Sequence, residues 1–234
     1  MAFTELFDRF RSLESQRQRL LAACPAGPLK AFYATPFPNP NQDFRSASYA
    51  ALDFETTGLD PAEHELLSYG LIDMEGTRID LGTAQHQILR PRGDIPEASA
   101  TVHEIRHQDT VDGIDEYDAL VELLALLAGK VMVVHYHKIE LGFLDAACRR
   151  HFSTGFLIPT IDTLQLAHRW IEDRNLFLRP SDLRLFNLAR RFGLPIGAAH
   201  NALSDAVLTM ELFLALTAQR LKETHVPIRS LSWN

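Results

Sequence analysis

The sequence predicts an α/β fold in which a mixed five-stranded sheet carries helices on its faces. The first observation is the order of the elements, because strand patterns fill the region from about residue 48 to residue 89 and helix patterns dominate after residue 116. The second is a short apolar run at 131–135, which is bounded by polar residues and indicates a buried strand. Strands followed by helices with crossover connections are typical of a mixed sheet covered by helices.

The chain begins with a predicted helix over residues 4–23. Apolar residues recur there at spacings near three, four and seven, Thr4 is a candidate N-cap, and Pro25 and Gly27 end the pattern. The apolar stripe indicates packing on the main domain or on a partner chain. Residues 25–44 contain five prolines, which favours a linker or an extended strap over the surface. We therefore expect removal of this region to leave a folded domain.

The sheet is predicted to start with a three-stranded antiparallel meander. Its strands cover residues 49–55, 65–74 and 77–89, with a turn at Glu75-Gly76 and an irregularity near Gly82. The second half of the chain adds buried strands at 131–135 and near 157–161. Helices are predicted at 116–127, 138–151, 162–172, 181–192 and 202–223.

The composition is that of a soluble globular protein. Hydrophobic residues make up 46% of the chain, no apolar run is long enough to span a bilayer, and the N-terminus does not have the pattern of a secretory signal. We therefore expect a cytoplasmic protein without membrane contact. Cys24 and Cys148 predict neither a disulfide framework nor a metal site. The formal net charge of −7 argues against tight non-specific binding to duplex nucleic acid.

The strongest functional signal is the stretch 51–59, where a strand runs into a turn. Side chains alternate along a strand, so Asp53 and Glu55 share one face while Leu52 and Phe54 point to the other. Two neighbouring carboxylates repel each other unless a cation lies between them, and a hard divalent ion prefers such oxygen ligands. Taken alone, the two acids are better explained by a solvated strand end than by a metal site.

The run Leu52-Asp53-Phe54-Glu55-Thr56-Thr57-Gly58 resembles the first motif of the DnaQ-like, DEDDh family of 3′-to-5′ exonucleases. His200 and Asp205, at the start of the last helix, resemble the family's His-x-x-x-x-Asp motif. The middle motif is less regular, because Glu140 stands where the family has aspartate and Tyr136 where it has asparagine. The resemblance covers most of the chain and implies the ribonuclease-H-like fold.

The resemblance implies that the protein hydrolyses DNA or RNA from the 3′ end and releases nucleoside 5′-monophosphates. Asp53, Glu55, Glu140 and Asp205 would hold two Mg²⁺ or Mn²⁺ ions, and His200 would be the general base. Asp162, at a helix start, is expected to be an N-cap with a structural role. The implied substrate contacts are Thr56, Thr57, Gly58, Leu59, His103 and Phe143.

The implied organisation is an N-terminal helix and linker over residues 1–45, an exonuclease domain over 46–226 and a C-terminal tail over 227–234. The expected partners are single-stranded 3′ ends of DNA or RNA and, through the N-terminal helix, a DNA polymerase or another protein. An alternative is a catalytically weakened nucleic-acid-binding or polymerase-associated subunit of the same fold, with Glu140 as the sign of decay.

Overall fold

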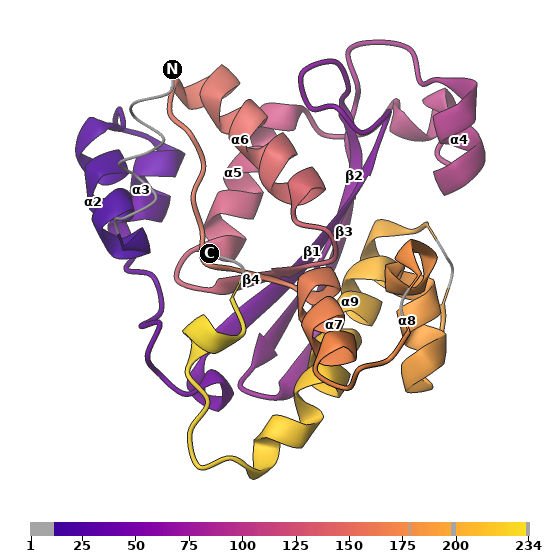
Figure 1. The fold of residues 1–234 in the computed structure, drawn as a ribbon. Coiled ribbons are helices and arrows are strands. Elements are labelled where there is room, and N and C mark those ends of the chain that lie inside the picture. Colours follow the sequence, from indigo (N-terminus) through magenta and orange to yellow (C-terminus); the bar gives the residue numbers. More distant parts are fainter. Residues whose placement is uncertain (1–11, 178, 198–199, 233–234) are drawn as a thin grey trace.

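The centre of the molecule is a five-stranded mixed sheet with the strand order β3-β2-β1-β4-β5, seen in the computed structural model of Figure 1. The structure describes residues 12–177, 179–197 and 200–232. Strands β1, β2 and β3 pair antiparallel, whereas β4 runs parallel to both β1 and β5, which confirms the predicted mixed sheet. The strands are β1 (Ser48–Thr56), β2 (Leu66–Glu75), β3 (Arg78–Ile88), β4 (Val131–Val134) and β5 (Thr160–Asp162).

The turn between β2 and β3 requires glycine. Gly76 has a φ of +62°, and a Cβ atom there would lie 2.5 Å from the carbonyl oxygen of Arg45. The pairing of β2 with β3 then shifts register between Leu71 and Asp73, opposite the segment that contains Gly82. The irregularity that the sequence predicts in the third strand is therefore confirmed.

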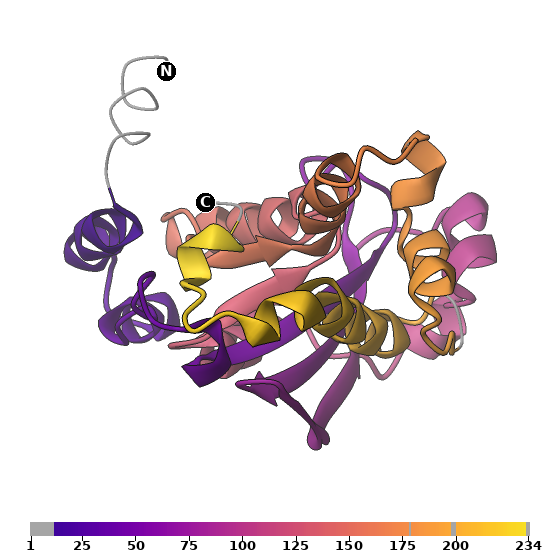
Figure 2. The ribbon, with the colours of Figure 1, turned by 60° about the horizontal axis from the view of Figure 1, so that its bottom comes forward.

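Helices cover both faces of the sheet (Figures 1 and 2). One face packs on α5 and α6, through Leu52 and Phe54 of β1. The other packs on α9, through Tyr49 and Ala51 of the same strand, and α7 and α8 pack on α9 in turn. The helices are α2 (Leu13–Ala23), α3 (Pro28–Ala34), α4 (Glu97–His103), α5 (Glu116–Leu127), α6 (Lys138–Phe152), α7 (Thr163–Glu172), α8 (Leu185–Phe192) and α9 (Ala202–Thr217).

Helix α9 is the central helix of the fold. The segment Ala202–Lys222 has the length and hydropathy of a membrane span. The expectation from the sequence that no apolar run is long enough to span a bilayer overlooked this segment. More than half of it is buried inside the protein, however, with Met210, Leu212 and Phe213 fully covered by the sheet and by neighbouring helices. The apolar character of this segment is therefore explained by core packing.

The N-terminal region differs from its prediction. Residues 4–11 and the candidate cap Thr4 lie outside the described residues, and the described helix α2 is capped by Ser12, whose side chain accepts from the backbone of Ser15. The expectation of a linker or strap over 25–44 is wrong for residues 28–34, which form α3. Three side chains of this short helix are buried against α5 and the core beneath it: Leu29, Phe32 and Tyr33.

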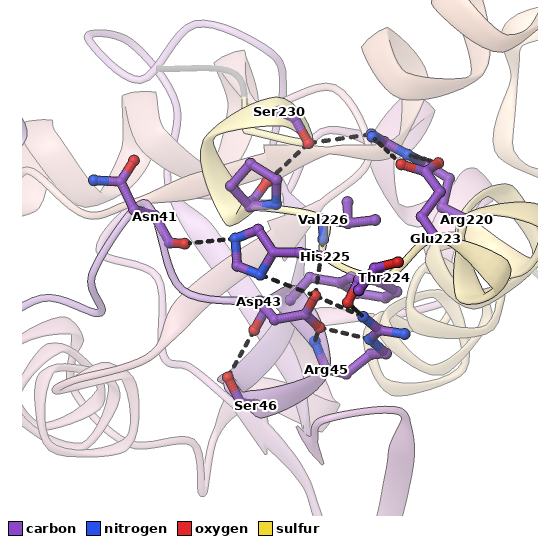
Figure 3. A network of polar contacts seen from close by, with 12 residues as sticks. Asn41, Asp43, Arg45, Ser46, Arg220, Glu223, Thr224, His225, Val226 and Ser230 are labelled. Carbon is purple, nitrogen blue, oxygen red and sulfur yellow. Dashed lines mark hydrogen bonds and ion pairs between the residues drawn. The ribbon is translucent and has the colours of Figure 1, made fainter.

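The N-terminal and C-terminal segments meet beside this core (Figure 3). The Asp43 carboxylate accepts from Arg45 and from the backbone N–H of Val226, and the imidazole of His225 lies 3.0 Å from the carbonyl oxygen of Asn41. Ile228 and Leu231, farther along, are buried in the same cluster as β1. Residues on both sides of the predicted domain boundaries at 46 and 226 therefore share one core.

Candidate active site

Three carboxylates meet where β1 ends and α9 begins. Oxygen atoms of Asp53, Glu55 and Asp205 all lie within 4.8 Å of one another, and among the described residues this is the group with the geometry of a metal site. Asp53 and Glu55 project from the face of β1 that α9 covers, as the alternation in the sequence predicts. Asp205 reaches them from the first turns of α9.

The close approach of α9 depends on Gly70. This residue is the β2 partner of Asp53 in the sheet, and a Cβ atom there would lie 2.1 Å from the backbone nitrogen of Leu203. Only a residue without a side chain lets the start of α9 lie against β2 at the point where that strand pairs with Asp53. No role was predicted for Gly70 from the sequence, although an isolated glycine within a strand pattern is the signal of such a close approach.

The turn before α9 fixes Asp205. The side chain of Asn201 caps the helix by accepting from the N–H of Ser204 at 3.1 Å. His200 has a φ of +57°, and its backbone N–H donates to the Asp205 carboxylate. This left-handed turn therefore places the backbone of His200 directly beside a predicted metal ligand.

The electrostatics of the cluster are dominated by burial and by repulsion between its carboxylates. Burial, together with the charges of Glu140, Asp205 and Glu55, raises the pKa of Asp53 well above its ordinary value. Burial raises the pKa of Glu55 to about 7 and that of Asp205 to about 6, and the charge of Asp205 adds to the shift at Glu55. A bound cation would remove this cost, because it stabilises every ionised carboxylate around it.

The charge of Glu140 also acts on Asp53, although Glu140 lies on α6, which covers the other face of the sheet from α9. It lies in the first turn of α6, is 2% exposed, and its Oε2 atom has no hydrogen-bond partner among the described residues. Asp205 Oδ1 is likewise buried without a partner in the described part of the chain. Burial and the charge of Asp162 raise the pKa of Glu140. Two unpartnered buried carboxylate oxygens beside a carboxylate cluster fit a hard divalent ion such as Mg²⁺ or Mn²⁺.

His200 lies in the turn that leads into α9 and precedes Asp205 by five residues. Its side chain is exposed, and its ring meets the ring of Phe186 on α8 in an edge contact with centroids 5.5 Å apart. The imidazole is thus accessible to solvent and to a substrate, as a general base must be.

The middle motif is organised by Asp162, which confirms the predicted cap. Its carboxylate accepts from the N–H groups of Leu164, Tyr136 and His137, and from His137 Nδ1 at 2.6 Å. Asp162 therefore ties the turn before α6 to the start of α7 and sets where α6 presents Glu140. No role was predicted for His137 from the sequence, because its partner lies 25 residues away.

His135, directly after β4, is held by hydrogen bonds within the protein. Its Nε2–H donates to the carbonyl oxygen of Leu183 at 2.9 Å, and Nδ1 lies 2.8 Å from the hydroxyl oxygen of Thr163. Burial lowers the pKa of His135 to about 4, so the ring is neutral at physiological pH. It connects β4 to the segment before α8.

The turn after β1 is built by the residues that the sequence predicts as substrate contacts. Thr57 pairs with Glu65 through two hydrogen bonds, one from its N–H and one to its hydroxyl oxygen. Gly58 lies under the ring of His64, where a Cβ atom would be 2.2 Å from the imidazole. Leu59 is 77% exposed at the tip of the turn. An exposed apolar side chain held by a rigid turn suits contact with a base.

The remaining two predicted contacts lie in different surroundings. His103 is buried; its Nδ1 accepts from Ile105 and its Nε2–H donates to Ser99 Oγ, which donates to the carbonyl oxygen of Thr56. This chain of bonds ties α4 to the end of β1. Phe143 is 3% exposed within the core cluster of α5 and α6, so its burial supports a packing role and gives no support to the predicted contact with nucleic acid.

The fold and the carboxylate cluster together define a ribonuclease-H-like domain of the nuclease type. The profile of the exonuclease family matches residues 50–213, which is more than half of the chain. The chain therefore belongs to this exonuclease family, and within it to the DnaQ-like, DEDDh group that the sequence motifs indicate.

Curated relatives include a DNA polymerase III subunit epsilon and a PolC-type DNA polymerase III. The chain is 30% identical to the DNA polymerase III subunit epsilon of Rickettsia prowazekii over 176 residues, which is 72% of this chain and 73% of the relative. It is 28% identical to the PolC-type DNA polymerase III of Thermotoga maritima over 171 residues, which is 73% of this chain and 12% of that relative. The chain thus spans only a small part of the PolC-type proteins.

Solved structures share the fold at lower identity. The nuclease domain of 3′hExo, a DEDDh family member bound to rAMP, superposes with a TM-score of 0.63 at 14% identity over 75% of this chain and 93% of that chain. Exonuclease X in complex with 5′ overhanging duplex DNA gives a TM-score of 0.59 at 18% identity over 78% and 98%. These likenesses confirm the predicted ribonuclease-H-like fold.

Proposed function

We propose that this protein is a metal-dependent 3′-to-5′ exonuclease that releases nucleoside 5′-monophosphates from the 3′ ends of DNA or RNA. The observation that carries the proposal is the cluster of Asp53, Glu55 and Asp205 within 4.8 Å, with the exposed His200 in the turn before the helix that carries Asp205. Family membership supports the reaction class, because the same residues match the family motifs.

The metal ions would be held by the four carboxylates Asp53, Glu55, Glu140 and Asp205. Two Mg²⁺ or Mn²⁺ ions, when bound, would supply a positive field that activates water and stabilises the leaving 3′ oxygen. The carboxylates would supply hard oxygen ligands. Glu140 Oε2 and Asp205 Oδ1, which are buried without a hydrogen-bond partner among the described residues, would be available to bind a metal ion. Glu140 replaces the family aspartate without loss of charge, which favours an active enzyme over a weakened binding subunit.

The protein's own groups would perform the remaining steps. His200 would accept the proton of the attacking water through its exposed imidazole, within reach of a nucleotide in the cluster. The turn around Gly58 would place the terminal nucleotide, with Leu59 against its base. Ser99 and His103 would hold α4 against the end of β1, so that the site keeps its shape when the strand enters.

The polymerase relatives suggest a role in DNA replication or repair in the cytoplasm. We infer this from the names of the relatives, and the N-terminal helices α2 and α3, which lie at the opposite end of the sheet from α4 and α8, would be available to meet a partner such as a polymerase (Figures 1 and 2). A pull-down of a replicative polymerase with the full chain, and its loss when exposed residues of α2 are changed, would test this.

The decisive experiment for the reaction uses matched DNA and RNA oligonucleotides labelled at the 5′ end. The purified protein with Mg²⁺ should produce a ladder of fragments shortened from the 3′ end, and EDTA should abolish it. Release of the labelled 5′ nucleotide without a ladder, or undiminished hydrolysis by Asp53→Asn, would refute the proposal.

A further inference from the structure

Four arginines gather around α8 in a chain that is acidic as a whole. The formal net charge of the chain is −7, yet residues 179–191 contain a single acid, Asp182. Like charges crowded on one surface repel each other and are costly unless an anion accompanies them. The four arginines are Arg179, Arg184, Arg190 and Arg191.

The packing of α8 determines where these charges point. Leu185, Leu188 and Ala189 are buried against α7 and α9, so the opposite side of this amphipathic helix faces solvent. The spacing of Asn187, Arg190 and Arg191 places them on that outer side. The arginines are therefore a surface feature, and they contribute nothing to the core.

The outer side of α8 borders an open polar pocket of about 480 Å³. Three guanidinium groups and one carboxylate line it. Asp182 pairs with Arg179 at 3.2 Å and Arg190 donates to Asn187 at 3.0 Å, while Arg191 lies 5.9 Å from the ring of Trp170. One carboxylate cannot neutralise three arginines, so a net positive charge remains. The lining residues are Arg179, Ser181, Asp182, Asn187, Arg190 and Arg191.

The first turn of α8 is joined to the candidate active site. Phe186 touches the ring of His200, and the carbonyl oxygen of Leu183 accepts from His135 at the end of β4. Figures 1 and 2 both show α8 at the same end of the sheet as α4, whereas α2 and α3 lie at the opposite end. A strand whose 3′ end lies in the carboxylate cluster can therefore continue over α8.

An exposed aromatic ring lies next to the pocket along the chain. Phe177 is 84% exposed and precedes Arg179 by two residues. Sites for single strands combine arginines that follow the backbone with aromatic rings on which bases stack. The segment that leads into α8 has both components.

We propose that the outer face of α8 is an extended strand-binding surface, on which Arg190 and Arg191, with Arg179, hold backbone phosphates upstream of the 3′ end and Phe177 stacks on a base. This inference rests on the proposed exonuclease function and specifies its substrate as a single strand of several nucleotides. Guanidinium groups suit this role because their planar donors match phosphate oxygens.

The test compares a long with a minimal substrate. Arg190→Gln/Arg191→Gln should raise the KM for a 15-nucleotide single strand several-fold and leave its kcat unchanged. Each contact between an arginine and a phosphate of a single strand adds about 0.7 to the magnitude of the slope of log affinity against log salt concentration. Because the double variant lacks two such arginines, its slope should be smaller than that of the wild type by about 1.4. Hydrolysis of the p-nitrophenyl ester of thymidine 5′-monophosphate, which is too short to reach α8, should stay as in the wild type.

Phe177→Ala should weaken binding of the long strand without changing the salt slope.

The control pair Lys222→Gln/Arg229→Gln removes the same charge from exposed positions in the C-terminal segment. If it raises the KM as much as the α8 pair does, the effect is one of net charge and the proposal is overturned. Equal affinity of the wild type and the α8 pair for the 15-mer also overturns it. Anisotropy of the labelled 15-mer in EDTA measures this affinity without catalysis. Failure of the wild type to cleave either substrate would instead refute the proposed function.

Discussion

Glu140, on α6, raises the pKa of Asp53, on β1, although the two residues are 87 positions apart in the sequence. Glu140 is buried and keeps one oxygen without a partner among the described residues. The charge of this glutamate thus acts on Asp53, which lies within 4.8 Å of Glu55 and Asp205. The helix that carries Glu140 is held at its start by Asp162.

Replacing Glu140 tests whether it is a metal ligand. Glu140→Gln keeps the shape of the side chain and removes its charge. Loss of a residue that only supports a metal ligand typically costs about 10- to 100-fold in activity, and we expect a larger fall in kcat here. Glu140→Asp should be partly tolerated, because a bridging water can make up the shorter reach. Asp145→Asn is the control, since that carboxylate binds Arg149 and the N–H of Phe156 away from the cluster. A fully active Glu140→Gln together with an inactive Asp145→Asn would show that the middle motif is aligned wrongly.

Removing the imidazole of His200 should lower kcat by about a hundredfold or more, as is usual for a general base. The expected cause is loss of proton acceptance alone, because the bond from His200 to Asp205 uses the backbone N–H and survives in His200→Ala. Steady-state rates, with Mn²⁺ affinity measured in parallel, check both points. Unchanged kcat would place the base elsewhere, and lost Mn²⁺ affinity would show that the turn itself had moved.

The stability of the metal-free protein should depend on pH in a direction set by the cluster. The pKa of Glu55 is raised to about 7 and that of Asp205 to about 6, both above their values in an unfolded chain. Ionisation is therefore costlier in the folded state, and the contribution of these groups to stability is lost as pH rises through this range. These two groups should therefore make the Tm in EDTA higher at pH 5.5 than at pH 8.

Divalent metal should reverse this loss, because it stabilises the ionised carboxylates. Mn²⁺ should raise the Tm more at pH 8 than at pH 5.5, and the difference should shrink in Asp53→Asn. Thermal scans with and without EDTA at the two pH values give the result. An equal effect of Mn²⁺ at both pH values would mean that it binds outside the cluster.

Gly70→Ala should damage the site without touching a catalytic group. The new methyl group would meet the backbone of Leu203, so α9 must shift away from β2 at a cost of about 1–3 kcal/mol. Asp205 would move with the helix, and we expect weaker Mn²⁺ binding and a lower kcat. Gly82→Ala is the matched control, since a Cβ atom there lies 3.2 Å from the flexible Asp80 side chain at an exposed position. Wild-type metal affinity in Gly70→Ala would show that the approach of α9 is not limiting.

Deletion of residues 1–44 should yield an unfolded or strongly destabilised protein, contrary to the expectation from the proline-rich sequence. The deletion removes Phe32, which stacks on Phe156 at 5.4 Å, and the fully buried Phe44. Phe32→Ala alone should cost about 3–5 kcal/mol. Urea unfolding of the point variant measures this loss, and a stable, active truncated protein would contradict the prediction.

The sequence by itself determined the fold class, most elements and three acids that the structure brings together, Asp53, Glu55 and Asp205. Alternation along β1 was sufficient to place Asp53 and Glu55 on one face and Leu52 and Phe54 on the other, because side-chain direction in a strand depends only on position. The cap Asp162 was recognisable for a similar reason, since capping is a local interaction with the first turn of a helix.

The tertiary structure decided what depends on contacts between distant segments. The helix at residues 28–34 was hidden because prolines on either side gave a local signal of a linker, while its stability comes from burial of Phe32 and Tyr33 against α5. The role of Gly70, the partners of His137 and the packing of Phe143 likewise arise from elements far apart in the chain. No local pattern identifies the partners in these contacts, because each becomes a physical constraint only when the sheet and its helices have assembled.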